Sequence, residues 1–363
     1  MKVNTISLNS VRLNTIALNH IGEIRSGGGG SKPSPIPQWI REHVVFYYDV
    51  KKQGATNETL KLSAYLQDLS GKGRRMKLNN FLFAEMSGVG GYNDNFLKWN
   101  SPSSYGNVEK VSSSEVVIKS LLGVQKGVLY IDLSIKAVNI RCHITGITKE
   151  IEGKFVFQYN KQGNKHIILK DGDFEFDSES LSLGSENGWV GFTTLEVIDN
   201  CNITITQIPE YPGALVTDGV DDYGLVENLS SGVKMLFMTV NPMSKNRVLY
   251  DARNNSGFAI YNTNAMIAYQ AINKQGFTYI NGVLNKTIYP YDLVGEKQVI
   301  TICNDTVPDS VKGMDVLFAS FNKNENMSCA FYNSLAFDSI PNESDGFTEQ
   351  ELIDYVLTNI IGQ

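Results

Sequence analysis

Acidic residues at every second position give residues 171–177 the clearest catalytic potential in the chain. Asp171, Asp173, Glu175 and Asp177 alternate there with apolar or small residues. A glycoside hydrolase needs two carboxyl groups about 5 to 9 Å apart across the sugar bond, and carboxylates at positions i and i+2 of one strand approach that spacing. The solvent-facing side of an exposed strand has the same pattern. We favour the exposed strand and keep a polysaccharide-degrading site as the alternative.

A second acidic group surrounds the glycine in residues 218–222. Asp218, Asp221 and Asp222 offer hard oxygen ligands close together, as Ca²⁺ prefers. Asp and Gly are also the usual residues of a plain polar turn. We expect no organic cofactor, and Ca²⁺ is the one ion that the sequence suggests.

Three aromatic residues in polar segments are the candidate ligand contacts. Trp99 and Tyr105 lie in the segment NDNFLKWNSPSSYG, and Trp189 follows a Glu-Asn-Gly sequence. Rings on the loops of a rigid scaffold are common binding residues, and they suit glycans. Trp189 can equally begin a core strand, since Val190 follows it.

Several classes of function have no sequence support. The chain contains no zinc-protease, phosphate-loop, nucleophile-elbow or Cys-x-x-C motif, and its four histidines are scattered, so we expect no enzyme. A net charge of −6 argues against a nucleic-acid partner. No apolar stretch approaches the length of a membrane span, and the first residues do not form a signal peptide. The four distant cysteines are expected to be reduced, with a Cys142–Cys201 disulfide as the alternative.

Strand patterns dominate the elements that must position these residues. Apolar and polar residues alternate over 138–145, 155–159 and 201–206, as in half-buried strands. Asn281-Gly282 predicts a two-residue hairpin turn. Thr348 and Glu351 form a capping box, which opens a C-terminal helix. The predicted fold class is all-β, with two β-sandwiches and one C-terminal helix.

The N-terminal 25 residues divide into five blocks of five, with an apolar residue opening each block and a Leu-Asn step in most. A period of five fits neither a helix nor a continuous strand, and so few repeats cannot bury a core alone. We therefore expect residues 1–25 to dock on a partner as an anchor or oligomerisation segment, through Ile6, Leu8, Asn9, Val11, Leu13, Asn14, Ile16, Leu18 and Asn19. A Gly/Pro-rich linker is predicted over residues 26–41.

Four ordered segments resemble the laminin-G/concanavalin-like β-sandwich, a jelly-roll module: ALVTDGVDDY (214–223), FTYINGV (277–283), AFYNSLAFD (330–338) and FTEQELIDYV (347–356). A turn over residues 66–73 resembles one near the start of that module. The resemblance implies that residues 42–107 and 212–363 form one sandwich, with a second sandwich over 108–211 inserted between them. Two domains in series are the alternative. The family usually binds glycans or proteins, and some members bind calcium.

Residues 50–58, 68–71, 86–92 and 202–211 also resemble virion structural proteins of crAss-like tailed phages. That resemblance implies a head fibre or tail-associated decoration located in the virion. Such a protein would bind capsid or tail proteins through residues 1–25, self-associate as a trimer or dimer, and bind host-surface glycans. A depolymerase and a purely structural cement between capsid or tail subunits are the alternatives.

Overall fold

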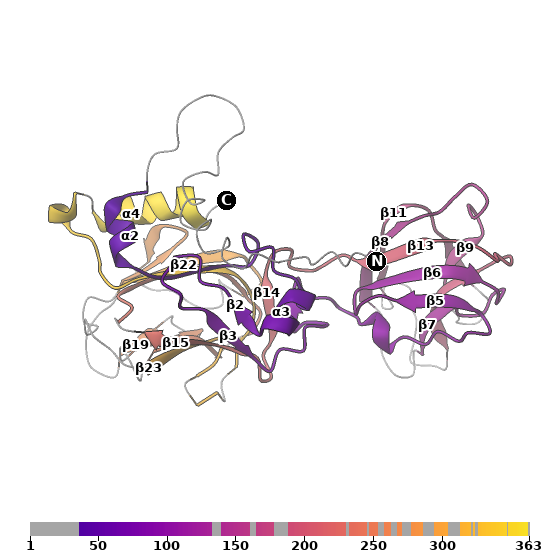
Figure 1. Ribbon diagram of the computed structural model, residues 1–363, viewed down its shortest axis with the longest axis horizontal. Helices are drawn as coiled ribbons and strands as arrows, with labels where there is room; N and C mark the ends of the chain where they lie inside the picture. The colour runs from indigo at the N-terminus through magenta and orange to yellow at the C-terminus, as the bar shows by residue number, and fades with distance from the viewer. Residues whose placement is uncertain are drawn as a thin grey trace, which may run out of the picture. The chain divides into compact units, whose positions relative to one another are not determined.

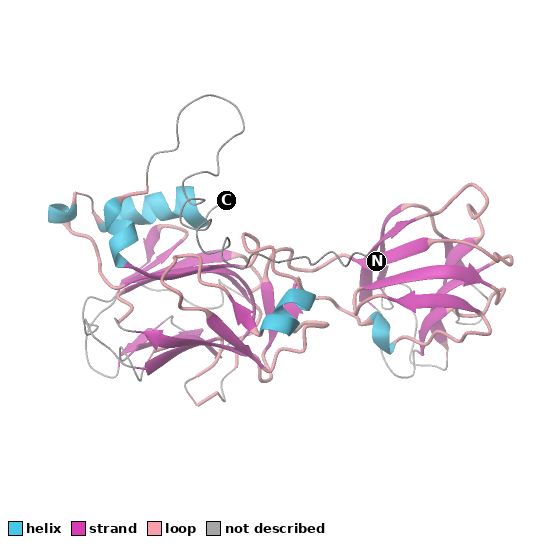
Figure 2. Ribbon diagram, viewed as in Figure 1, coloured by secondary structure: helices cyan, strands magenta, loops and turns pink. Residues whose placement is uncertain are grey.

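The computed structural model describes residues 36–132, 139–159, 165–177, 188–229, 232–244, 247–252, 258–262, 267–270, 277–285, 294–303, 313–320, 322–323, 326–346 and 348–361. These residues form two units (Figure 1). Unit 1 contains the chain up to Phe83, Ser87–Val89 and the chain from Gly213 onward, whereas unit 2 contains Ala84–Met86 and Gly90–Pro212. Both units consist mainly of antiparallel strands (Figure 2), which confirms the predicted all-β fold class.

Unit 1 is a β-sandwich of two sheets. In the described residues the first sheet has eight strands, ordered β21-β20-β22-β16-β24-β14-β4 with β1 beside β24: β1 (Val44–Asp49), β4 (Gly88–Val89), β14 (Leu215–Asp218), β16 (Met235–Pro242), β20 (Phe277–Ile280), β21 (Val283–Asn285), β22 (Gln298–Cys303) and β24 (Ser328–Phe337). The second has seven, ordered β19-β18-β17-β23-β15-β3-β2: β2 (Tyr65–Leu66), β3 (Met76–Asn79), β15 (Tyr223–Leu229), β17 (Arg247–Asp251), β18 (Phe258–Asn262), β19 (Ile267–Gln270) and β23 (Gly313–Leu317). Side chains such as Leu236 and Phe331 fill the core of unit 1.

Helices cover part of the outer face of the eight-stranded sheet (Figure 2). They are α2 (Gln38–His43), α4 (Glu349–Val356) and the π-helical turn η4 (Leu357–Ile361), and they build a second core with strand residues such as Phe237 and Phe337. Because both of its faces are covered, β16 is buried along its whole length. That explains why its sequence, MLFMTVNP, does not alternate.

Helix α2 corrects the C-terminal end of the predicted linker, which was placed over residues 26–41. Ile36, Trp39 and Ile40 are buried, and the Trp39 ring lies 5.4 Å from the ring of Phe337. The Pro-rich sequence before α2 suggested an extended spacer, but burial of these three side chains on the sheet stabilises a short helix. The anchor residues of segment 1–25 and the first part of the linker lie outside the described residues.

Two local predictions in unit 1 are confirmed. The Thr348 hydroxyl accepts a hydrogen bond from the backbone N–H of Glu351, and the Glu351 carboxylate accepts one from the backbone N–H of Thr348, so the capping box opens α4 as expected. Strands β20 and β21 pair around Asn281-Gly282, with both residues at positive φ. Only residues that tolerate positive φ fit this turn.

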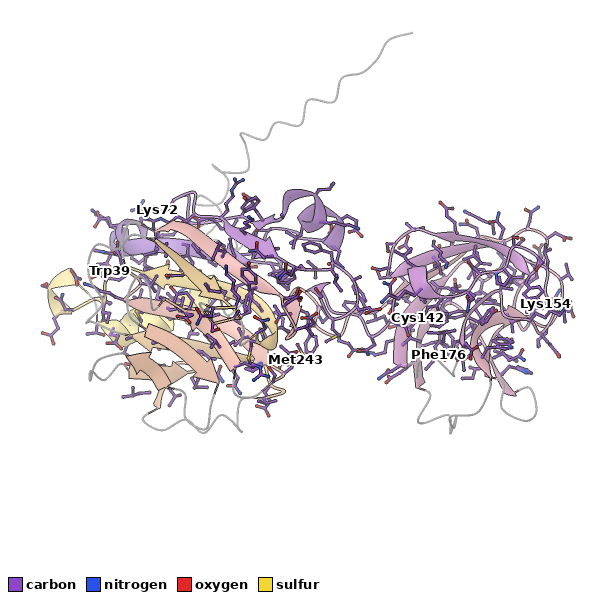
Figure 3. The ribbon with its side chains drawn as sticks, turned by 90° about the horizontal axis from the view of Figure 1, so that it is seen from below. Trp39, Lys72, Cys142, Lys154, Phe176 and Met243 are labelled. Atoms are coloured by element: carbon purple, nitrogen blue, oxygen red, sulfur yellow. The ribbon has the colours of Figure 1, made fainter. Side chains whose placement is uncertain are left out.

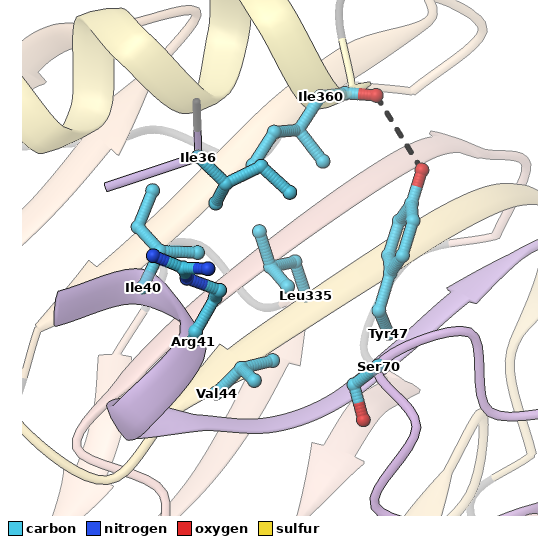
Figure 4. Close-up of a pocket in the computed structure, with 8 residues that line it drawn as sticks. All are labelled: Ile36, Ile40, Arg41, Val44, Tyr47, Ser70, Leu335 and Ile360. Atoms are coloured by element: carbon cyan, nitrogen blue, oxygen red, sulfur yellow. Dashed lines mark hydrogen bonds between the residues drawn. The ribbon is translucent and has the colours of Figure 1, made fainter. Parts of the chain in front are cut away.

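Hydrogen bonds join η4 to β1 and to the turn that follows β1. The Lys52 Nζ donates to the carbonyl oxygen of Ile360 at 2.6 Å, and the Tyr47 hydroxyl lies 3.4 Å from that oxygen (Figure 4). A cation here offsets the partial negative charge of a helix C-terminus. The apolar pocket beside this contact is lined by α2, β1, β24 and η4 together with Ser70, so it belongs to the second core of unit 1.

Unit 2 is a smaller β-sandwich. Its sheets have the orders β11-β8-β13-β6-β5 and β10-β9-β12-β7, from β5 (Gly106–Lys110), β6 (Glu115–Leu121), β7 (Leu129–Asp132), β8 (Asn139–Thr145), β9 (Phe155–Tyr159), β10 (Lys165–Ile168), β11 (Gly172–Asp177), β12 (Trp189–Thr194) and β13 (Ile203–Gln207). Cys142 and Phe176, labelled in Figure 3, face the core between these sheets. The rings of Phe157 and Phe176 stack there 3.8 Å apart, and Phe192 packs edge-on against both.

The chain before and after unit 2 builds unit 1 together. Strand β4 pairs with β14, so the segments on either side of unit 2 meet in one sheet. Unit 2 begins at Gly90 apart from Ala84–Met86, so residues 90–107 belong to it, whereas the sequence-based boundary fell between residues 107 and 108. Phe96 accounts for this difference, because it is buried in the core of unit 2.

Candidate functional site

Trp99 is a core residue, which corrects the expectation that its ring contacts a ligand. It follows the short 3-10 helix η1 (Phe96–Lys98) and is only 2% exposed. Its indole Nε1 donates to Asp94 Oδ1 at 2.9 Å, and its ring lies 5.5 Å from Phe96 and 6.1 Å from Phe192. A buried ring with a satisfied N–H is part of the packing of unit 2.

Tyr105 lies half-buried at one end of the unit 2 sandwich. The backbone N–H groups of Leu122 and Gly123 donate to its carbonyl oxygen, and the Lys126 Nζ lies 5.1 Å from its ring centroid. The chain enters and leaves at the other end of the sandwich, where Phe96 and Gln207 bond to the turn between β5 and β6. Tyr105 is therefore at the far end of unit 2 from its connections.

Exposed aliphatic side chains lie at the same end of unit 2 as Tyr105. Leu122 is 43% exposed, Val124 41% and Val197 53%. A β-bridge between Leu121 and Ile198 places their sequence neighbours Leu122 and Val197 side by side. A second β-bridge joins Val124 to Thr194. We call Tyr105, Leu122, Val124 and Val197 the distal rim. Apolar side chains gathered on a surface are typical of an interaction site.

Trp189 is half-buried at the start of β12, next to a ring that the sequence did not single out. The Tyr130 ring on β7 lies 5.6 Å from the Trp189 ring. Gly191 makes room for this pair, because a Cβ atom there would lie 2.2 Å from the carbonyl oxygen of Leu129. The alternation in VLYID, which puts Tyr130 out of phase with the buried residues, was the available signal. Trp189 and Tyr130 form a second, less exposed aromatic surface.

The acidic row lies on the solvent face of the five-stranded sheet. Asp173 Oδ1 lies 2.6 Å from His143 Nδ1, with the two side chains 72% and 52% exposed. Asp171 accepts a hydrogen bond from the backbone N–H of Ile147, and Glu175 lies opposite Arg141 in the register of β11 and β8. The Asp177 side chain lies outside the described residues. Every described carboxylate of the row thus has a hydrogen-bond or cross-strand partner on an open sheet face.

The three aspartates of the turn after β14 do come together. Their carboxylate oxygens lie within 4.8 Å of one another, with Asp218 half-buried, Asp221 exposed and Asp222 buried. Asp222 accepts hydrogen bonds from the Asp218 N–H and the Ser87 hydroxyl. Burial, and to a lesser degree the two neighbouring carboxylates, raises the pKa of Asp222 to about 7, although the two hydrogen bonds lower it. The set suits a hard cation such as Ca²⁺, which would favour the charged form.

The cysteines show no disulfide. Cys142, Cys201, Cys303 and Cys329 are all free, so the alternative of a Cys142–Cys201 bridge is not realised. Burial raises the pKa of Cys142 and of Cys329 to about 12, and a thiol in that state is a poor nucleophile.

Two further observations bear on context. None of the helices in the described part of the chain has the length and apolar character that a membrane crossing requires. Comparison with known proteins found no matching family model, no matching curated protein and no matching solved structure.

Proposed function

We propose that this chain is a non-enzymatic adhesion protein of a tailed-phage virion, and that unit 2 binds glycans through the distal rim. The observation that carries the proposal is the exposure of Leu122, Val124 and Val197 at the same end of unit 2 as Tyr105. An aromatic ring beside aliphatic side chains offers an apolar surface to the C–H face of a sugar. The nearby Lys126 ammonium can donate hydrogen bonds to sugar hydroxyls.

The place of the rim in unit 2 supports this role. A module that is connected to the rest of the chain at one end presents its other end to a partner, and the rim is at that other end. The virion context rests on the phage-like segments and on residues 1–25, which would fix the protein to capsid or tail proteins. A trimer or dimer would multiply weak glycan contacts into avidity.

A depolymerase is not favoured by any observation on the acidic row, since its carboxylates are spread along one open strand face. A structural cement remains the competing role, because an apolar rim also suits a protein partner. Neither role requires a nucleic acid or a membrane.

A matched pair of valine substitutions tests the rim. The full chain is screened against bacterial surface glycans, and the best ligand is titrated against Val197→Ser and Val111→Ser. Val197 and Val111 are 53% and 52% exposed, at opposite ends of unit 2. We expect Val197→Ser to weaken binding by about threefold or more, since about 0.7 kcal/mol of apolar contact is lost. Equal losses in both variants, or no bound glycan at all, would refute the rim and favour the cement.

A second experiment tests attachment to the particle. Peptide mass spectrometry of gradient-purified particles should find the protein at a fixed ratio to the major capsid subunit. Deleting residues 1–25 should abolish its incorporation while circular dichroism of the remaining chain stays unchanged. Normal incorporation of the deleted form would show that the anchor lies elsewhere.

A further inference from the structure

The outer face of the eight-stranded sheet of unit 1 has a polar part next to the helical layer. Strand β24 carries a β-bulge there: Thr239 pairs with Asn333 and Val240 pairs with Phe331, so Tyr332 is the extra residue. Bulges often redirect a side chain beside a functional site. Tyr332 is partly exposed.

One exposed lysine lies over this ring, and a second is close to the first. The Lys297 Nζ lies 4.1 Å from the centroid of the Tyr332 ring, which is close enough for a cation–π interaction. Lys51 lies two residues after the end of β1, and the N–H of the preceding residue, Val50, donates to the carbonyl oxygen of Tyr332. Burial, followed by the positive charge of Lys51, lowers the pKa of Lys297, so the two ammonium groups interact.

In the described part of the chain, neither ammonium group forms an ion pair with an acid. Within the described residues no carboxylate lies within ion-pair distance of Lys51 or Lys297, in a protein whose net charge is −6. The buried Asp49 is close, but its oxygens already accept hydrogen bonds from the Lys52 N–H and the Tyr47 hydroxyl. Glu296 accepts one from the side chain of Gln298.

The neighbouring Lys52 has a different role. Its ammonium group donates to the Ile360 carbonyl oxygen and to the Tyr47 hydroxyl, so it holds the C-terminal turn. Among the described residues, Lys51 and Lys297 donate to no such acceptor, so their ammonium groups can donate to a ligand. Two like charges close to each other repel, and an anion between them removes that repulsion.

We propose that Lys51, Lys297 and Tyr332 form a binding site for a carboxylate-bearing carbohydrate. The two ammonium groups donate hydrogen bonds to the carboxylate, and the Tyr332 ring packs against the sugar ring. An acidic surface polysaccharide is the class of molecule that carries both features. This site is in unit 1, so it does not depend on the distal rim of unit 2.

Isothermal titration of the full chain with a galacturonic acid trisaccharide tests the site. We expect the acid to bind at least tenfold more tightly than its methyl ester, with an affinity that falls as salt rises. Lys297→Gln and Lys51→Gln should each weaken binding about three- to tenfold. The control is Lys61→Gln, at an exposed lysine on α3 (Asn57–Ser63) of the same unit, which should bind as the unchanged protein does.

A second measurement locates the bound sugar directly. Bound trisaccharide should slow acetylation of Lys51 and Lys297 by acetic anhydride, read by mass spectrometry, and leave Lys61 unaffected. Absent binding, equal affinity for acid and ester, or equal loss in the control variant would overturn the proposal. Inorganic phosphate binding as tightly as the trisaccharide would also overturn it, since the site would then recognise an anion alone. Rim variants such as Val197→Ser leave this site intact, so the two proposals fail independently.

Discussion

Replacing Trp99 by alanine should destabilise unit 2 strongly, because the ring is only 2% exposed and packs on Phe96 and Phe192. Large-to-small substitutions of buried Trp or Phe cost about 3 to 5 kcal/mol. The substitution also removes the indole N–H that donates to Asp94 at 2.9 Å, and a hydrogen bond to a charged group is worth about 1.5 to 3 kcal/mol. The two effects overlap, so we expect about 4 kcal/mol in total.

Hydrogen–deuterium exchange with mass spectrometry is the suitable assay, because it reports the two units separately. About 4 kcal/mol corresponds to roughly a thousandfold faster exchange for amides that open only with unit 2. Peptides from unit 1 should not change. Trp99→Phe retains most of the packing and should give an intermediate effect, mainly from the lost hydrogen bond.

Trp39→Ala is the matched control, since Trp39 is buried in the second core of unit 1 and its effect should stay in that unit. Exchange in unit 2 that changes less than about tenfold in Trp99→Ala would refute the reasoning. Loss of glycan binding at unchanged stability would likewise mean that Trp99 is a ligand contact after all.

Four other predictions concern stability. The pKa of Asp222 is raised to about 7, so the folded state binds more protons than the unfolded state between about pH 4 and pH 7. The free energy of unfolding should therefore fall as pH rises through this window, by at most about 4 kcal/mol. Urea titrations should show a smaller fall in Asp222→Asn. If the aspartate cluster holds Ca²⁺, millimolar Ca²⁺ should raise the melting temperature at pH 8 in the unchanged protein and not in that variant, and no shift in either would argue against the ion. Gly191→Ala should disrupt unit 2, since the added Cβ would meet the Leu129 carbonyl oxygen at 2.2 Å, and unchanged exchange in unit 2 would contradict the β7–β12 register. Thr348→Ala should cost about 1 kcal/mol through the lost cap of α4, measured by urea unfolding against Thr358→Ala as a control beyond the helix start.

Local features were predictable wherever neighbouring residues decide the structure. The alternation over Asn139–Thr145 gave a strand whose apolar residues are buried and whose His143 faces solvent. The Asn281-Gly282 turn and the Thr348 cap followed from backbone geometry that few residue types satisfy. The aspartates around Gly219 had to be close to one another, because the five residues 218–222 of one turn contain all three.

Burial of residues outside regular patterns was not predictable in the same way. Trp99 and Tyr105 lie in one polar segment, yet the first packs against Phe192, almost a hundred positions along the chain, and the second reaches the distal rim. Tyr130 became a candidate only through its contact with Trp189 on another strand. Likewise, α2 exists because Trp39 meets Phe337 at the other end of the chain.

Residues a few positions apart decide the strand-rich fold class, the tight turns and the helix cap, so these features could be predicted without the structure. The tertiary structure alone decided which aromatic rings are core and which are exposed, and where Lys51 and Lys297 meet. Such features depend on contacts between distant segments, and a pattern of neighbouring residues contains no information on which strands will pair.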